Sequence, residues 1–252
     1  MSIKLFDINS QAKGNFNGGE ILENKPIGFP QDGGDLKPYS NLFYWAHAWA
    51  PNNDSIIGLH PHRGFEICSF VLKGEIEHYD TLLDKWITLN EGDVQVIKAG
   101  KGISHSEKLK SGSEIFQIWF DPNLHESLYI DASYNDYKSD EFNIESKNFI
   151  STKVISDSNN QIDLDSKGIE IYHHIIEKGD LKHKIQQNKC HSIFIQSGSI
   201  EINELKLNKG DFVIIEKEDE VKLKINSDSK VFEIISLTKP PYTTYAEMHN
   251  IN

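Results

Sequence analysis

The two halves of this 252-residue chain repeat the same order of short apolar segments separated by glycines, and this repeat limits the folds open to it. Three pairs of segments match in order: 73–80 (KGEIEHYD) with 197–204 (SGSIEINE), 90–100 (NEGDVQVIKAG) with 208–218 (NKGDFVIIEKE), and 114–120 (EIFQIWF) with 230–236 (KVFEIIS). The offset drifts only from 124 residues at Gly74 and Gly198 to 116 residues at Phe116 and Phe232. We therefore predict an internal duplication, with two similar domains in tandem.

The apolar residues of the first half come in short runs with alternating polarity or β-branched and aromatic side chains, which is typical of strands. The predicted strands are 41–50, 65–72, 75–80, 86–89, 93–98, 103–109 and 114–120. Seven short strands are enough to close a sandwich or a barrel. The predicted fold class is all-β, with one β-barrel in each half.

A polar stretch at residues 121–146 (DPNLHESLYIDASYNDYKSDEFNIES) interrupts this rhythm and is rich in turn formers. Such a composition favours a surface connection between two units. We expect an N-terminal domain at residues 1–130 and a C-terminal domain at residues 131–252.

Charge and cysteine content exclude several classes of function. The formal net charge of -12 argues against direct nucleic-acid binding, which needs a basic surface. Cys68 and Cys190 lie far apart in apolar surroundings, as buried free thiols do in a reducing compartment, so we expect a cytoplasmic protein. No long apolar run predicts a membrane segment, and no glycine-rich nucleotide loop or serine-hydrolase motif occurs.

His60 and His62 flank a proline and begin the strongest chemical motif of the chain. In a strand, residues two apart point to the same face, so both imidazoles can reach one point. Because proline cannot donate to a sheet ladder, we expect Pro61 at the start of a strand or on an edge strand.

His105 and Glu107 form a second pair with the same spacing, on the strand that follows two glycines. Two such strands facing each other inside a barrel would bring three imidazoles and a carboxylate together. This donor set suits a divalent transition metal, Fe(II) first, with Mn, Co, Ni, Cu or Zn as alternatives. On a six-coordinate ion it leaves two positions open.

Glu66 is a rival carboxylate, because His-x-His-x3-Glu is also a known ligand spacing in β-barrels. A kink at Gly64 would let it approach the metal or orient a ligand histidine. In the second half, a constant offset from His60 and His62 falls on Lys184 and Gln186, so we expect no metal ligands in the C-terminal domain. His183, Cys190 and His191 form a loose cluster without a standard zinc spacing.

At these residues the sequence resembles the pirin family of the cupin superfamily. The matching stretches are HPHRGFE (60–66), GEIEHYDT (74–81), EGDVQVIKAGKGISHSE (91–107) and, less closely, IFQIWF (115–120). The resemblance implies a bicupin, two tandem cupin-type β-barrels with metal in the N-terminal barrel only. It also implies His60, His62, His105 and Glu107 as the ligands, the set already reached from strand alternation.

The resemblance implies different function classes, because family members are described as iron-binding proteins, as dioxygenases that cleave the flavonol quercetin, or as a nuclear transcriptional cofactor. We expect a metal-dependent dioxygenase of the quercetin 2,3-dioxygenase type, acting on a small enolic or phenolic substrate, with Glu107 or Glu66 accepting the substrate proton. The alternative is a non-catalytic, redox-responsive module that binds a protein partner. A metal-dependent isomerase or hydrolase is a third reading.

Overall fold

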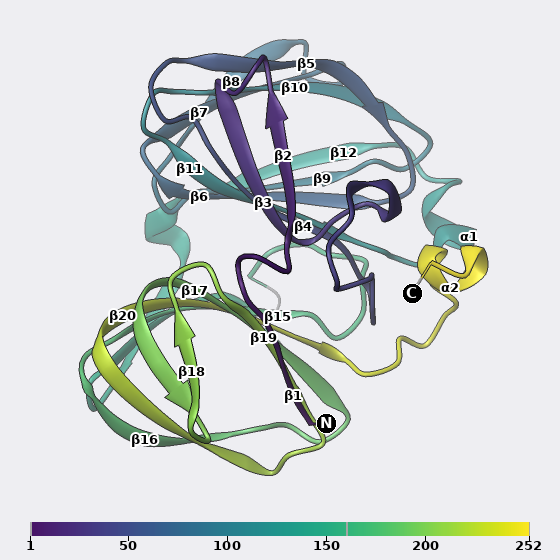
Figure 1. Ribbon diagram of the computed structural model, residues 1–252. Helices are drawn as coiled ribbons and strands as arrows, with labels where there is room; N and C mark the ends of the chain where they lie inside the picture. The colour runs from purple at the N-terminus through teal and green to yellow at the C-terminus, as the bar shows by residue number, and fades with distance from the viewer. Residues whose placement is uncertain (1, 160, 252) are drawn as a thin grey trace. The chain divides into compact units, whose positions relative to one another are not determined.

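The computed structural model describes residues 2–159 and 161–251, which form antiparallel strands with a few short helical turns (Figure 1). Contacts divide the chain into two compact units. The first, called here the N-terminal barrel, comprises residues 11–141, 163–166 and 242–252. The second, the C-terminal barrel, comprises residues 1–10, 142–162 and 167–241. Each unit is described separately below.

The N-terminal barrel is built from two sheets. The larger sheet has the strand order β12 (Ser133–Tyr137), β9 (Val94–Lys98), β6 (Glu66–Lys73), β11 (Glu114–Phe120), β4 (Leu42–Trp49), β3 (Ile21–Ile27) and β2 (Ala12–Phe16). The smaller sheet has the order β5 (Ser55–His62), β10 (Ile103–Leu109), β7 (Glu75–Asp80) and β8 (Lys85–Asn90). Short helices lie at η1 (Pro30–Asp32), α1 (Leu124–Ser127), η2 (Ser139–Glu141) and α2 (Tyr245–His249).

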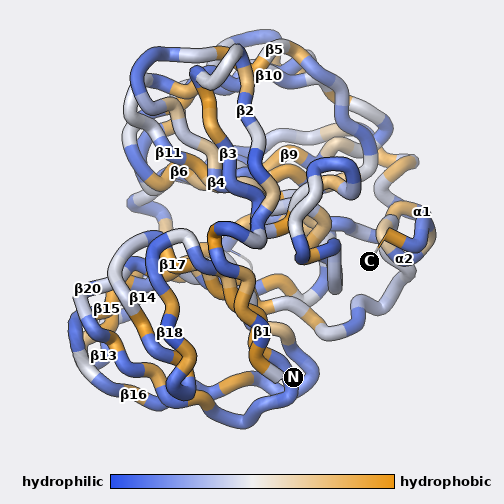
Figure 2. Tube along the Cα trace, viewed as in Figure 1, coloured by the Kyte–Doolittle hydropathy of each residue, from blue (hydrophilic) through white to orange (hydrophobic). Residues whose placement is uncertain are grey.

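Alternating side chains from both sheets fill the interior of the N-terminal barrel. Ile76 and Leu109 of the smaller sheet pack with Ala48, Val71 and Ile115 of the larger one, and all five are buried. The apolar stretches of β3, β6 and β9 stand out in Figure 2. Burial of apolar area at about 25 cal/mol per Å² makes this contact the main force that closes the two sheets.

The C-terminal barrel is one highly bent sheet. Its path runs β1 (Ile3–Phe6), β19 (Phe212–Glu216), β17 (Lys189–Ile202), β20 (Glu220–Leu237), β15 (Glu170–Ile176), β14 (Ile150–Ser156) and β13 (Asn143–Lys147), with β16 (Gly179–Lys184) paired to β20 and β18 (Leu205–Asn208) paired to β17. The long strand β17 corresponds to β6 and β7 of the N-terminal barrel. The long strand β20 corresponds to β10 and β11. The predicted duplication is visible in this order.

The prediction of an all-β chain with two barrels is confirmed, and each of the seven predicted strands is present within two residues of its expected ends. Both cysteines are free and buried, as expected. The polar stretch at 121–146 is more than the expected surface connection, because its residues Ser133–Tyr137 form β12 and extend the larger sheet beside β9. Within the described residues, no helix is long and apolar enough to cross a bilayer.

The two units are not the contiguous halves, 1–130 and 131–252, that were expected. β1, at the start of the chain, pairs with β19 and belongs to the C-terminal barrel. At the other end, the backbone N–H of Tyr245 donates to Asp121 Oδ2 at 2.5 Å and fixes α2 in the N-terminal barrel. Composition alone carries no signal for such long-range exchange of terminal segments.

A close backbone approach at Gly100 shapes the turn that leads into β10. Gly100 has φ +50°, and a Cβ there would lie 2.5 Å from the Ile130 carbonyl oxygen and 2.9 Å from the Ala132 nitrogen. Gly112 has φ +76° with nothing within 4 Å of the same atom.

We expect Gly112→Ala to lower the free energy of unfolding by about 1 kcal/mol through backbone strain alone. Gly100→Ala adds a clash with rigid backbone and should cost about 3 kcal/mol. Urea denaturation followed by circular dichroism measures both. Equal losses in the two variants would contradict the close approach at Gly100.

Candidate metal centre

The centre lies where two neighbouring strands of the N-terminal barrel present histidines to each other. β5 pairs with β10 so that His60 faces His105 and His62 faces Ile103. β5 is the edge strand of its sheet, so the edge position expected for Pro61 is confirmed. The histidines sit at the end of β5 and not at its start.

An irregularity in the pairing re-aims the side chains of β5. Between the pairs His105 with His60 and Glu107 with Ile57, β5 contains one residue more than β10. Such a bulge shifts the alternation by one. It allows Ile57 and His60, three residues apart, to line the same cavity.

The three imidazoles converge through the same ring atom. His105 Nε2 lies 3.0 Å from His60 Nε2 and 2.9 Å from His62 Nε2. His60 Nδ1 lies 2.7 Å from the carbonyl oxygen of Gly58, to which it donates, and this leaves the Nε2 lone pair free. Outer hydrogen bonds of this kind orient metal-binding histidines.

Burial keeps two of these rings neutral. Desolvation, followed by the neighbouring imidazoles, lowers the pKa of His62 to about 3. Desolvation and the His60 and His78 rings lower the pKa of His105 to about 3. The buried His105 Nδ1 has no hydrogen-bond partner among the described residues. Neutral rings whose lone pairs face one another fit a divalent transition metal, because a shared cation replaces their mutual repulsion by ligation.

Glu107 is fully buried and lines the cavity with His60 and His62. Its Oε1 accepts from Ser69 Oγ at 2.9 Å and its Oε2 accepts from Gln117 Nε2 at 2.5 Å. The ligand atoms of His60, His62 and His105 lie within 4.8 Å of one another, and the Glu107 carboxylate lies outside this group. The structure therefore brings Glu107 to the same cavity and holds it on the wall beside the three histidines.

The cavity has a volume of about 380 Å³, and its walls include the aromatic rings of Phe16, Phe29, Tyr44 and Trp119. The Trp119 ring meets the His62 ring edge to face at 4.7 Å, and its Nε1 donates to Gln117 Oε1 at 3.3 Å. None of the sequence motifs above assigned Phe16, Phe29 or Tyr44 to a pocket. Strand alternation on β4 and β11 would have placed Tyr44 and Trp119 inward, but nothing in the sequence marks the loop residue Phe29.

A second carboxylate in the cavity was also missed. Glu23 of β3 is buried, accepts from the Tyr44 hydroxyl at 3.4 Å and lies 3.4 Å from Lys25 Nζ. Desolvation raises the pKa of Glu23, although Lys25 opposes the shift. No sequence signal marked it, because its strand has the mixed sequence ILENKPI and was not among the predicted strands.

Glu66 requires a correction, because the structure places it away from the histidines. Its oxygens accept from the backbone N–H groups of Asp165, at 2.6 Å, and Ser166, at 2.9 Å. Ser69, three residues further along β6, points into the barrel toward Glu107, so alternation directs Glu66 outward. Glu66 anchors the segment 163–166 and is neither a ligand nor a proton acceptor at the centre.

The C-terminal barrel also differs from expectation. His183 and His191 lie with Glu233 in a group whose ligand atoms are within 4.8 Å of one another. Cys190 is not part of it, because neighbouring residues of β17 point to opposite faces. Burial alone would raise the pKa of Glu233, but the charge of His183 and hydrogen bonds from the surrounding histidines hold that pKa well below its usual value. The structure thus gathers potential metal-binding side chains in the half of the chain where no metal ligands were expected.

Comparison with known proteins agrees with this architecture. Residues 34–120 match the family model "Pirin" and residues 158–234 match "Quercetinase C-terminal cupin domain". A quercetin 2,3-dioxygenase of Escherichia coli (strain K12) is 29% identical over 211 residues, covering 76% of this chain and 87% of the relative.

Two solved structures have the same fold. One is the bacterial pirin YhhW from Escherichia coli in complex with nickel(II), with a TM-score of 0.76, 22% identity and coverage of 93% of this chain and 99% of that one. The other is a quercetin 2,3-dioxygenase from Acinetobacter baumannii, with a TM-score of 0.80, 16% identity and coverage of 96% and 80%.

Two tandem barrels of this topology, with a histidine cluster inside the first, define a bicupin, a two-barrel protein of the cupin superfamily. The pirin family model matches residues 34–120, so the chain is similar to pirins over most of its N-terminal barrel. The predicted resemblance and the predicted cupin-type fold are both confirmed.

The assignment of Glu66 leads to a prediction that separates anchoring from ligation. Glu66→Gln replaces one acceptor oxygen by an amide that cannot accept the N–H of Asp165 or Ser166, so we expect a loss of about 2 kcal/mol in the free energy of unfolding. The bound metal per chain should stay unchanged, whereas Glu107→Gln should lower it. Denaturant titration and metal analysis provide the two measurements, and loss of metal in Glu66→Gln would refute the anchoring role.

Proposed function

We propose that the N-terminal barrel binds one divalent transition metal, Fe(II) first, through His60, His62, His105 and Glu107. The observation that carries this proposal is the convergence of three Nε2 atoms, two of whose separations are 2.9 and 3.0 Å. Ligand atoms about 2.0–2.2 Å from one ion lie about 3 Å or more from each other, so the rings need little movement. Mn, Co, Ni, Cu and Zn suit the same donors.

Glu107 is proposed as the fourth ligand because its hydrogen bonds leave lone pairs of the carboxylate available to a metal ion. An ionised carboxylate offers about four lone-pair sites, and Ser69 and Gln117 each occupy one. Ligating carboxylates in metal sites are commonly held by such outer hydrogen bonds. The hydrogen bond from Trp119 to Gln117 extends this support to the aromatic wall.

We propose further that the protein is a dioxygenase of the quercetin 2,3-dioxygenase type, acting on a small enolic or phenolic substrate. Support comes from the aromatic cavity of about 380 Å³ and from the names of its relatives. When bound, the metal supplies Lewis-acid stabilisation of a deprotonated substrate oxygen and a template for the reactants. Phe29, Tyr44 and Trp119 stack against a planar ring and exclude water.

The proton of the substrate hydroxyl goes to a carboxylate in the cavity. Glu107 is placed for this, since it lines the cavity with His60 and His62 and its position is fixed by Ser69 and Gln117. A base held within hydrogen-bond reach contributes about 10²–10⁴-fold to a rate. Removing the proton makes the substrate electron-rich, which is what a reaction with dioxygen without nicotinamide or flavin requires.

Metal binding is tested first, by analysis of protein reconstituted with Fe(II) under anaerobic conditions. His105→Ala removes the central imidazole, and we expect the metal affinity of the N-terminal site to fall at least 100-fold. His125→Ala is the matched control, because His125 is an exposed residue of α1. If the metal titration of the wild type contained no binding step that His105→Ala removes, the proposed centre would be disproved.

Activity is tested by following the absorbance of quercetin and the consumption of dioxygen with metal-loaded protein. Expressed per bound metal, turnover should fall at least 10²-fold in Glu107→Gln, which loses the base. In Ser69→Ala, which loses one hydrogen bond to that base, it should fall about tenfold.

A protein with a full N-terminal site but no turnover across a panel of flavonols and other phenols would contradict the dioxygenase. That outcome would favour the alternative, a redox-responsive module that binds a protein partner. Pull-down with the Fe(II) and Fe(III) forms would then test whether the partner discriminates between them.

A further inference from the structure

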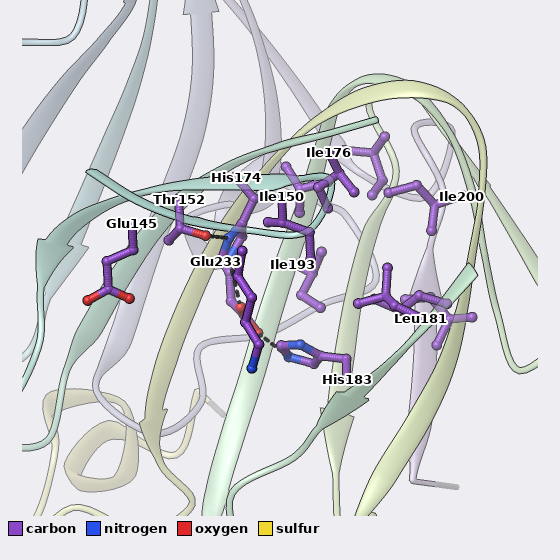
Figure 3. A pocket seen from close by; sticks show the side chains of 15 residues that line it. Glu145, Ile150, Thr152, His174, Ile176, Leu181, His183, Ile193, Ile200 and Glu233 are labelled. Carbon is purple, nitrogen blue, oxygen red and sulfur yellow. Dashed lines mark hydrogen bonds and ion pairs between the residues drawn. The ribbon is translucent and has the colours of Figure 1, made fainter. Parts of the chain in front are cut away.

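A second cluster of metal-binding side chains lies inside the C-terminal barrel. Glu233 of β20 is 2% exposed and stands at its centre. His191 Nδ1 lies 2.7 Å from Glu233 Oε1, and His183 Nε2 lies 3.3 Å from the same oxygen. His174 Nε2 lies 3.1 Å from Oε2. Figure 3 shows His174 and His183 approaching Glu233 from different strands.

The register of the strands relates this cluster to the centre of the first barrel. β16 pairs with β20 so that His183 faces Val221, as His60 faces His105 in β5 and β10. The 116-residue offset from Phe116 to Phe232 also takes His105 to Val221. His183 therefore occupies the barrel position of His60, and the same offset takes Gln117 to Glu233.

Hydrogen bonds decide which imidazoles can turn a lone pair toward a cation. The backbone N–H of Gln186 donates to His191 Nε2 at 3.1 Å, so the proton of neutral His191 resides on Nδ1 and is donated to Glu233. An amide N–H cannot accept, and His191 is thereby fixed as a donor. It holds the carboxylate in place.

His174 and His183 are free of this restriction. His174 Nδ1 lies 2.9 Å from Thr152 Oγ1, and because a hydroxyl can accept as well as donate, His174 can keep its proton on Nδ1 and free Nε2. His183 Nε2 is buried and contacts Glu233 Oε1 at 3.3 Å as an ion pair without hydrogen-bond alignment, so a metal ion would take the place of the proton on this nitrogen. His183 Nε2 lies 3.3 Å from Oε1 and His174 Nε2 lies 3.1 Å from Oε2, on the other side of the carboxylate, so the two rings must turn toward each other to share one ion.

We propose that the C-terminal barrel binds a second divalent transition metal through His174, His183 and Glu233, with His191 as a positioning residue. Two imidazoles and one carboxylate form the donor set of open, non-haem Fe(II) sites and also suit Zn(II). His174, His183 and Glu233 line a cavity of about 240 Å³ whose remaining wall is mostly aliphatic, with the polar exceptions Glu145, Lys147 and Thr152. The open positions of the ion would face this cavity.

The test is the number of metal ions per chain after anaerobic loading with Co(II) and gel filtration. We expect two ions in the wild type, one in His105→Ala, and none in His105→Ala combined with His183→Gln. His105→Ala with His173→Gln is the matched control and should keep one ion, because His173 is the neighbour of His174 on the opposite face of β15. The visible spectrum of Co(II) in His105→Ala should show imidazole ligation.

Failure of this proposal differs from failure of the proposed function. A wild type with one ion and a His105→Ala variant with none would overturn the second site and keep the first, and the C-terminal cluster would then be a hydrogen-bonded part of the core. One ion in the wild type and one in His105→Ala would overturn the N-terminal site and keep the C-terminal one. Neither comparison depends on a substitution in the C-terminal barrel, so misfolding of His183→Gln cannot obscure the outcome.

Glu233→Gln supplies an independent variant, and we expect it also to remove the ion retained by His105→Ala. His191→Gln separates positioning from ligation. In the His105→Ala background it should weaken Co(II) binding about 10-fold while leaving the number of imidazole ligands in the spectrum unchanged. A changed ligand number would make His191 a ligand and overturn its assigned role.

Discussion

The antiparallel register between β5 and β10 is the constraint on which the rest of the N-terminal barrel's chemistry depends. It places His60 opposite His105, and the extra residue in β5 turns Ile57 to the same side as the histidines. A slip of one residue would send these imidazoles to the other face of the sheet. The buried apolar pairs that close the two sheets therefore also determine whether three lone pairs meet.

The side chains around the site are held in place by residues that do not contact the three Nε2 atoms. Ser69 and Gln117 occupy one oxygen each of Glu107, and Trp119 holds Gln117 while it packs on His62. Four strands of two different sheets thus share one polar network. Because the network is buried, loss of one partner leaves another polar group unsatisfied, which costs about 1–3 kcal/mol. This couples the precision of the site to the stability of the barrel.

Local alternation was enough to predict much of this. The spacing of His60 with His62, and of His105 with Glu107, requires only that each pair lie on a strand. The structure places His60, His62 and Glu107 on the cavity, with His105 Nε2 3.0 Å from His60 Nε2. Glu66 failed because its face depends on where β6 begins after the turn at Gly64, which no short pattern specifies. The match of His183 to His60 was missed for a related reason: the offset between Gly74 and Gly198 leads from His60 to Lys184, one residue beyond His183, and one residue reverses the face.

The exchange of terminal segments has a consequence for the order of synthesis on the ribosome. β1 leaves the ribosome first, yet its partner β19 follows about two hundred residues later, so the edge of β1 stays unpaired while the N-terminal barrel is being made. The N-terminal barrel in turn receives α2 only when the last residues appear. Domains usually fold one after the other as they emerge. Here neither barrel acquires its full set of elements until translation is nearly over, and a single cut between residues 11 and 241 yields no fragment that contains a complete barrel.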